Sequence, residues 1–521
     1  MKDEQTRAIM IKSGVRQGYP LSPFLFNLIM DELLVELQGS DLGPSLGGSR
    51  VPALAFADDL TVMADNEAEM NEILRICEKF FDARGMSANA KKCQSMKLLP
   101  AKGKNVLSCT TTPHRYWKGV AMASLTYKDL VKYLGVHLDP RGQVQINLTD
   151  IEAEMVNLLK SDLRMFQKAD AIRSNLIPWW LHKLRLSDLP VTKMRKVDNL
   201  VKKYYKRILH LPEWTSDAWL HHPRGGRLIN ITMLIAKSKA DSATSMAICG
   251  DPAANEVGQE ILDEMMLYRR RCGVEEVELS ETRKYYIKQC LEKVRKEKPN
   301  GVARACMLES ARDRKWLWYG QTTGTELITT MLLMAGQLPC RTNLARGNPA
   351  QLKICRRCSQ SNEYEMHILQ ECSFGKQLRQ RRHNVIVKAV AKDLRTKGWT
   401  VEEEKWIRHE GENFKPDLIF WRGQVGYIAD VQIPYEKNKM TLEDRMNKKA
   451  EKYEEKLWST RMPTTVTDRK ALGLIIGTTG TVMECNTQPF RELRLLSKLD
   501  GYCRMAAQGS AAIWRCHHRG R

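Results

Sequence analysis

Along the first hundred residues, hydrophobic positions alternate between helical and strand-like spacing. Leu25, Ile29 and Leu33 recur every four positions, which predicts a helix. A second helix is predicted to begin at Asn66, and Glu69 three residues later completes a capping box. The apolar stripe of this second helix has members three or four residues apart: Met70, Ile73, Leu74, Cys77 and Phe80.

The pattern is mainly helical up to residue 350. Residues 150–211 predict basic amphipathic helices, and Thr192 is a candidate N-cap for one of them. Its apolar stripe consists of Val197, Val201, Tyr204 and Ile208. Strand-like alternation returns after residue 415 and includes the apolar run at residues 471–477. These changes predict domain boundaries near residues 145, 215, 350 and 376.

Charge is the informative part of the composition. Among 521 residues, 83 Lys and Arg face 61 Asp and Glu, a formal net charge of +22. An excess spread along the whole chain suits a nucleic-acid backbone better than a small acidic ligand. No apolar run approaches the roughly 20 residues needed to span a bilayer, so no membrane partner is expected. The 14 cysteines mostly stand singly, which favours a reducing compartment over a disulfide scaffold.

Two adjacent carboxylates, Asp58 and Asp59, lie between two short apolar strands in the segment AFADDLTVMA. Such a pair on a tight turn can hold a divalent metal that neutralises triphosphate charge and activates a primer hydroxyl. Aspartate is also a common turn residue. The pair alone therefore leaves both interpretations open.

Four segments in order resemble the palm of reverse transcriptases. The loop GVRQGYPLSPFLFN corresponds to a Gly-Gln-Gly loop that shapes the template and nucleotide pocket in that family, and its candidate binding residues are Gly14, Arg16, Gln17 and Gly18. The resemblance implies that Asp58 and Asp59 hold catalytic Mg²⁺ or Mn²⁺. It also implies that Lys92, in GMSANAKKC, lies near the incoming dNTP. Residues 133–136, YLGV, match the hairpin that grips the primer.

The sequence departs from this family in two ways. Tyr19 stands where the family usually has Asp. Family members also carry another catalytic Asp tens of residues before the position of Gly14, and here the only preceding Asp is Asp3. We therefore expect this chain to be the C-terminal part of a longer protein, which alone would not extend a primer.

A Cys/His cluster follows the helical region, with the spacing C-x2-C-x8-H-x4-C. It consists of Cys355, Cys358, His367 and Cys372. Three thiolates and one imidazole complete a tetrahedral Zn²⁺ site and leave no position open, so we expect one structural zinc. The alternative is a set of scattered buried cysteines. Contact with nucleic acid is suggested by the flanking cations, Lys353, Arg356, Arg357 and Lys376.

The segment KPDLIFWRGQVGYIADVQI predicts a β-hairpin. Gly423 and Gln424 form its turn, and glycine at the first central position suits a type II′ turn. In the resulting register, Asp417 lies opposite Asp430 on the same face. Like charges so placed destabilise a sheet unless a cation lies between them. A metal site is thus the economical explanation, and two solvated aspartates are the alternative.

A charged helix is predicted after the hairpin, with Thr441 as N-cap and Asp444 three residues later. Lys449, Lys452 and Lys456 would share one face of it. Glu–Lys pairs on that face are the ordinary explanation for such a helix.

The hairpin and helix together resemble the restriction-like endonuclease of site-specific non-LTR retrotransposons, of the "R-two" type that inserts into ribosomal RNA genes. The matching pattern is Pro-Asp at Asp417, an acid at Asp430, and Lys-x-x-Lys-Tyr from Lys449 to Tyr453. The resemblance implies that the two aspartates bind Mg²⁺ or Mn²⁺ for strand cleavage. Lys452, or alternatively Lys449, would stabilise charge on the phosphate.

Two further positions bear on this resemblance. The family's Arg-His-Asn element appears at Arg382 and His383, which are therefore candidate nucleic-acid-binding residues. Gln432 stands two positions after the second acid, where the wider nuclease class often has Lys. The helix must therefore supply the lysine.

The resemblance covers essentially the whole chain and implies a multidomain α/β protein. The expected parts are a partial reverse transcriptase palm (1–145), a helical thumb (146–215), a helical linker (216–350), a zinc knuckle (351–376) and a restriction-like endonuclease domain with a basic tail (377–521). The family implies target-primed reverse transcription, in which the endonuclease nicks chromosomal DNA, here ribosomal RNA genes, and the freed 3′ hydroxyl primes copying of the element RNA from dNTPs.

We expect synthesis in the cytoplasm and action in the nucleus. Two alternatives remain open: a group II intron-type reverse transcriptase or maturase, and a domesticated or decayed nucleic-acid-binding protein. Metal-dependent nicking separates an enzyme from a binding protein.

Overall fold

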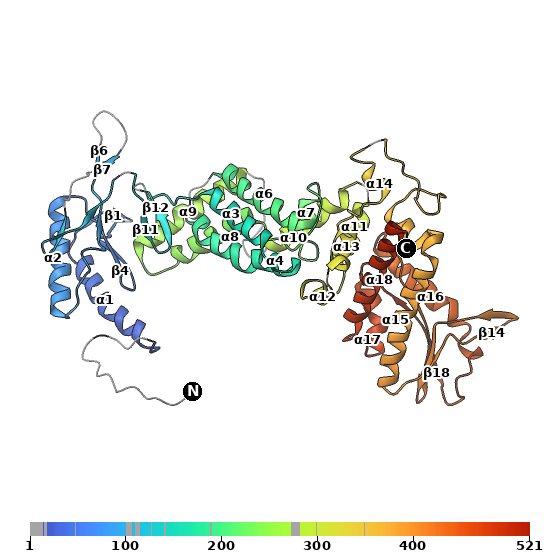
Figure 1. Ribbon diagram of the computed structural model, residues 1–521. Helices are drawn as coiled ribbons and strands as arrows, with labels where there is room; N and C mark the ends of the chain where they lie inside the picture. The colour runs from blue at the N-terminus through green and yellow to red at the C-terminus, as the bar shows by residue number, and fades with distance from the viewer. Residues whose placement is uncertain are drawn as a thin grey trace, which may run out of the picture. The chain divides into compact units, whose positions relative to one another are not determined.

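The computed structural model describes residues 14, 18–46, 48–100, 107–109, 115–126, 128–139, 142–187, 190–271, 282–298, 300–322, 324–348 and 350–520. The fold is mixed α/β, as predicted (Figure 1). The chain divides into two compact units, each described by itself. The first contains residues 1–146, 182–189 and 235–279, and the second contains residues 147–181, 190–234 and 280–521.

The first unit is built around two helices, α1 (Ser22–Gln38) and α2 (Glu67–Ala83), and the hairpin of β3 (Ala53–Phe56) and β4 (Asp59–Val62). The buried side chains between the helices include Leu33 from α1 and Phe80 from α2. Asn66 caps α2, and its side chain accepts a hydrogen bond from the backbone N–H of Glu69 at 3.0 Å. The predicted N-cap and apolar stripe are thus confirmed.

The other described strands before residue 140 are short: β1 (Ser45–Leu46), β2 (Ser49–Arg50), β5 (Gln94–Ser95), β6 (Leu98–Pro100), β7 (Leu107–Cys109), β8 (Tyr116–Trp117), β9 (Val120–Ala121), β10 (Ala123–Ser124), β11 (Val131–Tyr133) and β12 (Val136–Leu138). Strands β11 and β12 pair antiparallel. Leu134 and Gly135 form their turn with φ of 45° and 82°, so the hairpin predicted at YLGV is confirmed.

Helices dominate the described residues from 148 to 344: α3 (Leu148–Lys160), α4 (Met165–Ala171), η1 (Ile172–Leu176), α5 (Ile177–Arg185), α6 (Val191–Ile208), α7 (Asp217–His221), α8 (Ile231–Ala247), α9 (Pro252–Arg271), α10 (Thr282–Lys296), α11 (Gly301–Leu308), α12 (Lys315–Trp318), α13 (Gly324–Met334) and α14 (Arg341–Leu344). The predicted stripe of α6 is buried. The N-cap prediction at Thr192 is wrong, because Pro190 holds that position. Proline has a fixed φ and lacks an N–H, and both suit a helix start.

The rest of the chain alternates helix and strand: η2 (His367–Glu371), η3 (Ser373–Gly375), α15 (Lys376–Thr396), β13 (Thr400–Glu403), β14 (Ile407–His409), β15 (Glu412–Phe414), β16 (Leu418–Arg422), β17 (Val425–Gln432), α16 (Lys439–Glu454), η4 (Leu457–Ser459), β18 (Asp468–Ile475), α17 (Glu484–Glu492) and α18 (Leu499–Arg519). Four strands form a sheet in the order β13-β16-β17-β18. The first three are antiparallel, and β18 runs parallel to β17.

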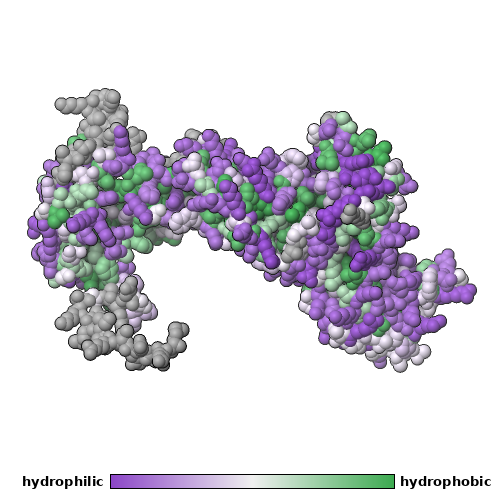
Figure 2. Space-filling model, in the orientation of Figure 1, coloured by the Kyte–Doolittle hydropathy of each residue, from purple (hydrophilic) through white to green (hydrophobic). Residues whose placement is uncertain are grey.

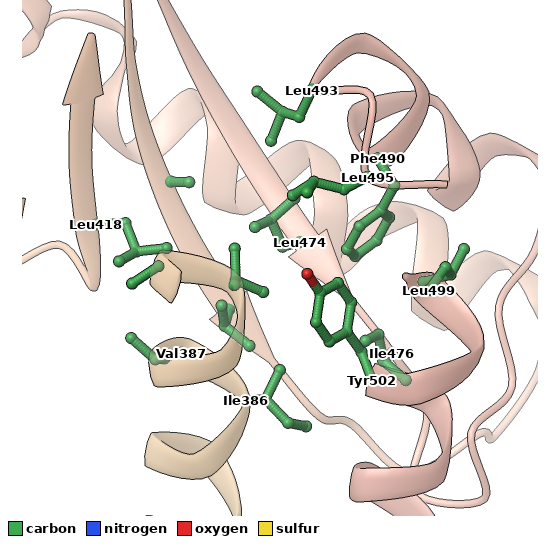
Figure 3. Close-up of a cluster of buried hydrophobic side chains, with 14 of the residues drawn as sticks. Ile386, Val387, Leu418, Leu474, Ile476, Phe490, Leu493, Leu495, Leu499 and Tyr502 are labelled. Carbon is green, nitrogen blue, oxygen red and sulfur yellow. The ribbon is translucent and has the colours of Figure 1, made fainter. Parts of the chain in front are cut away.

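Helices cover both faces of this four-stranded sheet. On one face, α15, α17 and α18 bury a core that includes Ile386, Leu418 and Tyr502 (Figure 3). On the other face, α16 packs Tyr453 against Ile428 of β17. Hydrophilic side chains cover much of the visible surface of the region that contains this sheet and its helices (Figure 2). Among the described residues, no helix combines the length and apolar character required to traverse a bilayer.

Candidate functional site

Asp417 and Asp430 lie side by side at the base of the β16–β17 hairpin. Arg422 pairs with Val425 across the turn, and Gly423 has a φ of 60°, so the predicted register and glycine turn are confirmed. The backbone N–H of Asp417 donates to Oδ1 of Asp430 at 3.1 Å. Side-chain exposure is 17% for Asp417 and 5% for Asp430. The hairpin thus holds two carboxylates together in a largely dehydrated place.

His383 reaches the same carboxylates from α15. Its Nε2 lies 3.0 Å from Oδ2 of Asp417 and 3.1 Å from the carbonyl oxygen of Val431. A carbonyl can only accept, so Nε2 carries the proton. Burial is the largest single influence and opposes the positive charge, but the hydrogen bond to Asp417, the charge of Asp417 and the hydrogen bonds to Asn384 and Val431 together outweigh it and raise the pKa of His383 above its ordinary value. His383 is therefore placed to orient Asp417 rather than to contact nucleic acid from the surface.

Helix α16 supplies a lysine to the pair. Nζ of Lys449 lies 2.7 Å from Oδ2 of Asp430. Lys452, the residue favoured by the sequence, donates instead to the hydroxyl of Tyr453 at 3.0 Å. Tyr453 is 1% exposed, and burial together with the charges of Asp430 and Asp417 raises its pKa, so its phenol stays protonated.

The start of α16 differs from the prediction. The helix begins at Lys439, and the side chain of Asn438 accepts from the backbone N–H of Thr441 at 2.8 Å. Thr441 is therefore not the N-cap. The helix ends at Glu454, so Lys456 lies beyond it and does not share the predicted face.

The donor set around the hairpin fits a hard cation. Carboxylate oxygens are the ligands that Mg²⁺ prefers. Gln432 has the same parity along β17 as Asp430 and so lies on the same face. Its Oε1 is buried without a hydrogen-bond partner in the described part of the chain. Sequence reasoning treated Gln432 only as a missing lysine and did not identify this oxygen.

The predicted Cys/His cluster also assembles. Ligand atoms of Cys355, Cys358, His367 and Cys372 all lie within 4.8 Å of one another. Nε2 of His367 lies 3.3 Å from Sγ of Cys358, and the hydroxyl of Ser361 lies 2.8 Å from Nδ1 of the same ring. Three sulfur atoms and one imidazole are a donor set that Zn²⁺ prefers.

Two of the arginines near this cluster point inward. Arg356 forms an ion pair with the buried carboxylate of Glu363 at 2.7 Å. Nε of Arg357 donates to the carbonyl of His517 at 2.6 Å. These contacts anchor the segment within the chain, and the expectation that both half-buried arginines face nucleic acid stays a prediction. Lys353 and Lys376 are exposed.

Arg382 is likewise not a surface residue. It is 6% exposed, and its Nη1 donates to the hydroxyl of Ser510 on α18 at 2.8 Å. Burial lowers the pKa of its guanidinium to about 10. The structure gives Arg382 a packing role between α15 and α18, and its binding of nucleic acid stays a prediction.

The second predicted carboxylate pair occupies a tight turn. Phe56 pairs with Asp59 across the β3–β4 hairpin, so Ala57 and Asp58 form the turn. Ala57 has a φ of 51°, and both aspartates are exposed. Lys92 is exposed as well.

The loop predicted to shape the nucleotide pocket is described only in part. Gly14 and Gly18 have φ of 83° and 82°, a conformation that glycine adopts readily. Arg16 and Gln17 lie outside the described residues.

Comparison with known proteins bears both on the region of the Asp58–Asp59 turn and on the region of the Asp417–Asp430 pair. Residues 1–138 match the family of reverse transcriptases (RNA-dependent DNA polymerases). The chain is 29% identical over 510 residues to a retrovirus-related Pol polyprotein from type-1 retrotransposable element R2 of Popillia japonica, covering 95% of this chain and 69% of the relative. The chain is therefore similar to Pol polyproteins of R2 retrotransposable elements over most of its length.

Two other relatives agree. The chain is 30% identical over 455 residues to a retrovirus-related Pol polyprotein from type-2 retrotransposable element R2DM of Drosophila melanogaster, covering 85% of this chain and 42% of the relative. It is 28% identical over 438 residues to one from type-1 element R2 of Nasonia vitripennis, covering 81% and 40%. The predicted resemblance to retrotransposon Pol proteins is thus confirmed, and the comparisons favour it over the group II intron and decayed binding-protein alternatives.

Proposed function

We propose that this chain carries two active centres of a non-LTR retrotransposon protein, a reverse transcriptase and a DNA endonuclease that together perform target-primed reverse transcription. The reverse transcriptase match and the Asp58–Asp59 turn support the first centre. The observation that carries the second is the pairing of Asp417 with Asp430 beside Lys449. Element RNA, dNTPs and chromosomal DNA, in particular ribosomal RNA genes, would be the partners, and the nucleus the place of action.

At the nuclease centre, Asp417 and Asp430 would hold Mg²⁺ or Mn²⁺. Such an ion supplies polarisation of the scissile phosphate and lowers the pKa of a bound water. Lys449 would stabilise charge that develops on the phosphate. His383 would keep Asp417 in position through its Nε2 hydrogen bond. Because these groups lie on a strand, a hairpin base and two packed helices, their geometry is rigid.

At the polymerase centre, Asp58 and Asp59 would bind the metal ions that neutralise the dNTP triphosphate. Lys92 would approach the incoming nucleotide. The Cys/His cluster would hold one structural Zn²⁺, because its four donors complete a tetrahedral shell.

The endonuclease proposal is tested with supercoiled plasmid that contains a ribosomal RNA gene segment. We expect the purified chain to convert it to the open circular form with Mg²⁺ or Mn²⁺, and not with EDTA. Comparison with a plasmid lacking the segment measures target preference. Binding without nicking in Mg²⁺ and Mn²⁺ would instead support the nucleic-acid-binding alternative.

A further inference from the structure

The last turn of α18 brings a histidine to the cysteine cluster. Nε2 of His517 lies 3.3 Å from Sγ of Cys355, although the two residues are far apart in the sequence. The imidazole is 1% exposed and meets the ring of Phe374 edge-on, at 6.0 Å between ring centres. His517 is not one of the four converging residues of the predicted zinc site.

A separate metal site at this histidine is disfavoured by its neighbours. Cys355, Glu363 and His517 also have potential ligand atoms within 4.8 Å of one another. The carboxylate of Glu363, however, is occupied by the guanidinium of Arg356 and by the backbone N–H of Arg341 at 3.0 Å. Ligation by Glu363 would leave the arginine charge unpaired, which is costly in a buried place.

We propose that His517 donates an N–H···S hydrogen bond to the thiolate of Cys355 and thereby fixes the zinc-loaded cluster to α18. This inference rests on the proposed zinc site. Nδ1 of His517 is buried without a hydrogen-bond partner within the described residues. A neutral ring with its proton on Nε2 leaves Nδ1 as an unpaired acceptor and not as an unpaired donor. A metal-bound thiolate is the negatively charged acceptor that suits the Nε2–H.

Other contacts hold the same helix end against the cluster. Arg357 donates to the carbonyls of His517 at 2.6 Å and His518 at 3.0 Å, and so satisfies carbonyls that have no partner within the helix. Gly520 permits this approach, because a Cβ there would lie 2.6 Å from Nη1 of Arg357. Hydrophobic contact adds to the attachment, since Ile368 of η2 packs in one cluster with Trp514 of α18.

The attachment has a consequence beyond the cluster. Tyr502 and Ala506, nearer the start of α18, lie in the core that covers the sheet carrying Asp417 and Asp430. Figure 3 shows Tyr502 within this core. One helix therefore contacts both the cluster and the nuclease sheet. Loss of the metal or of the hydrogen bond should loosen the end of α18 and lower the stability of the sheet that it covers.

The test compares side chains of similar size at position 517, one with a hydrogen-bond donor and one without. In His517→Gln, the side-chain amide can donate from nearly the position of Nε2, whereas His517→Leu fills the space without a donor. His518→Ala is the control for loss of a neighbouring imidazole: His518 stacks on Trp514, its Nδ1 lies 3.0 Å from Nη1 of Arg356, and it is not among the converging ligand groups of the described residues. Should the leucine variant not fold, His517→Met provides a second donor-free side chain.

The readouts are the rate of Zn²⁺ transfer from the full chain to a chelator and the thiolate-to-metal charge-transfer band of the Co²⁺-substituted chain. Removal of an outer hydrogen bond to a metal ligand commonly weakens metal binding about 10- to 100-fold. We expect one metal per chain in every variant, release about 10- to 100-fold faster in His517→Leu with a shifted charge-transfer band, and near-parent values in His517→Gln and His518→Ala.

Three results would overturn the proposal of a hydrogen bond from His517 to Cys355. Parent-like release and spectrum in His517→Leu would show that the contact has no effect on the cluster. Equal acceleration in the leucine and glutamine variants would show that the ring only fills space. A change in the intensity of the cobalt d–d bands in His517→Leu would show a changed coordination shell, and so would show that His517 is a metal ligand. A parent chain that takes up neither Zn²⁺ nor Co²⁺ rejects the zinc site itself, and this is seen before any variant is compared.

Discussion

Nζ of Lys449 contacts Oδ2 of Asp430 at 2.7 Å, while Lys452, three residues later on α16, reaches only the hydroxyl of Tyr453. The approach of α16 to the sheet explains why a lysine arrives there at all. A Cβ at Gly473 of β18 would lie 2.5 Å from the carbonyl oxygen of Met446, so glycine is needed for the helix to pack this closely. The contact places Lys449, one turn after Met446, over the carboxylates.

The first prediction separates these two lysines. Lys449→Ala should lower the single-turnover nicking rate by about 100- to 1000-fold, the usual effect of losing one group that stabilises transition-state charge. DNA affinity should change much less. Lys452→Ala is the matched control on the same helix and should retain a rate within tenfold of the parent. The reverse order of the two effects would favour the lysine that the sequence indicated.

The second prediction concerns the metal-binding pair. Asp417→Ala should abolish nicking because it removes one of two carboxylates that would hold the ion. DNA affinity should stay equal or rise, since a negative charge next to the phosphates is lost. Nicking of plasmid and equilibrium binding in EDTA measure the two quantities separately. Asp468→Ala, at an acid 53% exposed on β18, is the control, and a parent-like rate in Asp417→Ala would refute the site.

How far the sequence predicts this site depends on the range of the interaction. The β16–β17 register followed from a two-residue turn and the alternation of side chains, which are local features, and the pairing of Asp417 with Asp430 is confirmed. The choice between Lys449 and Lys452 depends on how α16 packs on β18, and helical spacing contains no information on that. The orphan oxygen of Gln432 likewise appears only once the sheet is assembled.

For charged residues too, the sequence alone does not show which partners they find in the folded chain. A positive side chain beside a cysteine cluster is equally compatible with a solvent-facing phosphate site and with an internal ion pair. Arg356 meets Glu363 close by in the sequence, but Arg357 and Arg382 find their partners on α18, far along the chain. Composition correctly indicates that the chain is basic, but it cannot show which cations are occupied internally.

The third prediction tests the proposed zinc. Cys358→Ser should lose the metal, because one of four ligands is removed, and the region around residues 355–372 should become sensitive to protease. Zinc ligation contributes about 10 kcal/mol or more of folding free energy in small zinc peptides. Metal analysis of the purified chain gives the stoichiometry. Cys249→Ser, at a half-buried thiol outside the cluster, should keep the zinc, and a parent chain without zinc would contradict the assignment.

The fourth prediction separates the two proposed centres. Asp58 lies at the turn of β3 and β4, in the first compact unit, whereas Asp417 and Asp430 belong to the second. In a preparation of the protein that extends a primer on an RNA template, Asp58→Ala should abolish DNA synthesis, because the exposed turn loses a carboxylate that would bind the catalytic metal. Nicking should continue at the parent rate.

Asp417→Ala should show the opposite pattern when a pre-nicked target supplies the 3′ hydroxyl, since polymerisation then needs no cleavage. Asp31→Ala, at an exposed acid of α1, controls for the loss of negative charge in the first unit. If Asp58→Ala slowed nicking as much as synthesis, the two activities would share a centre, and the assignment of separate carboxylate pairs would fail.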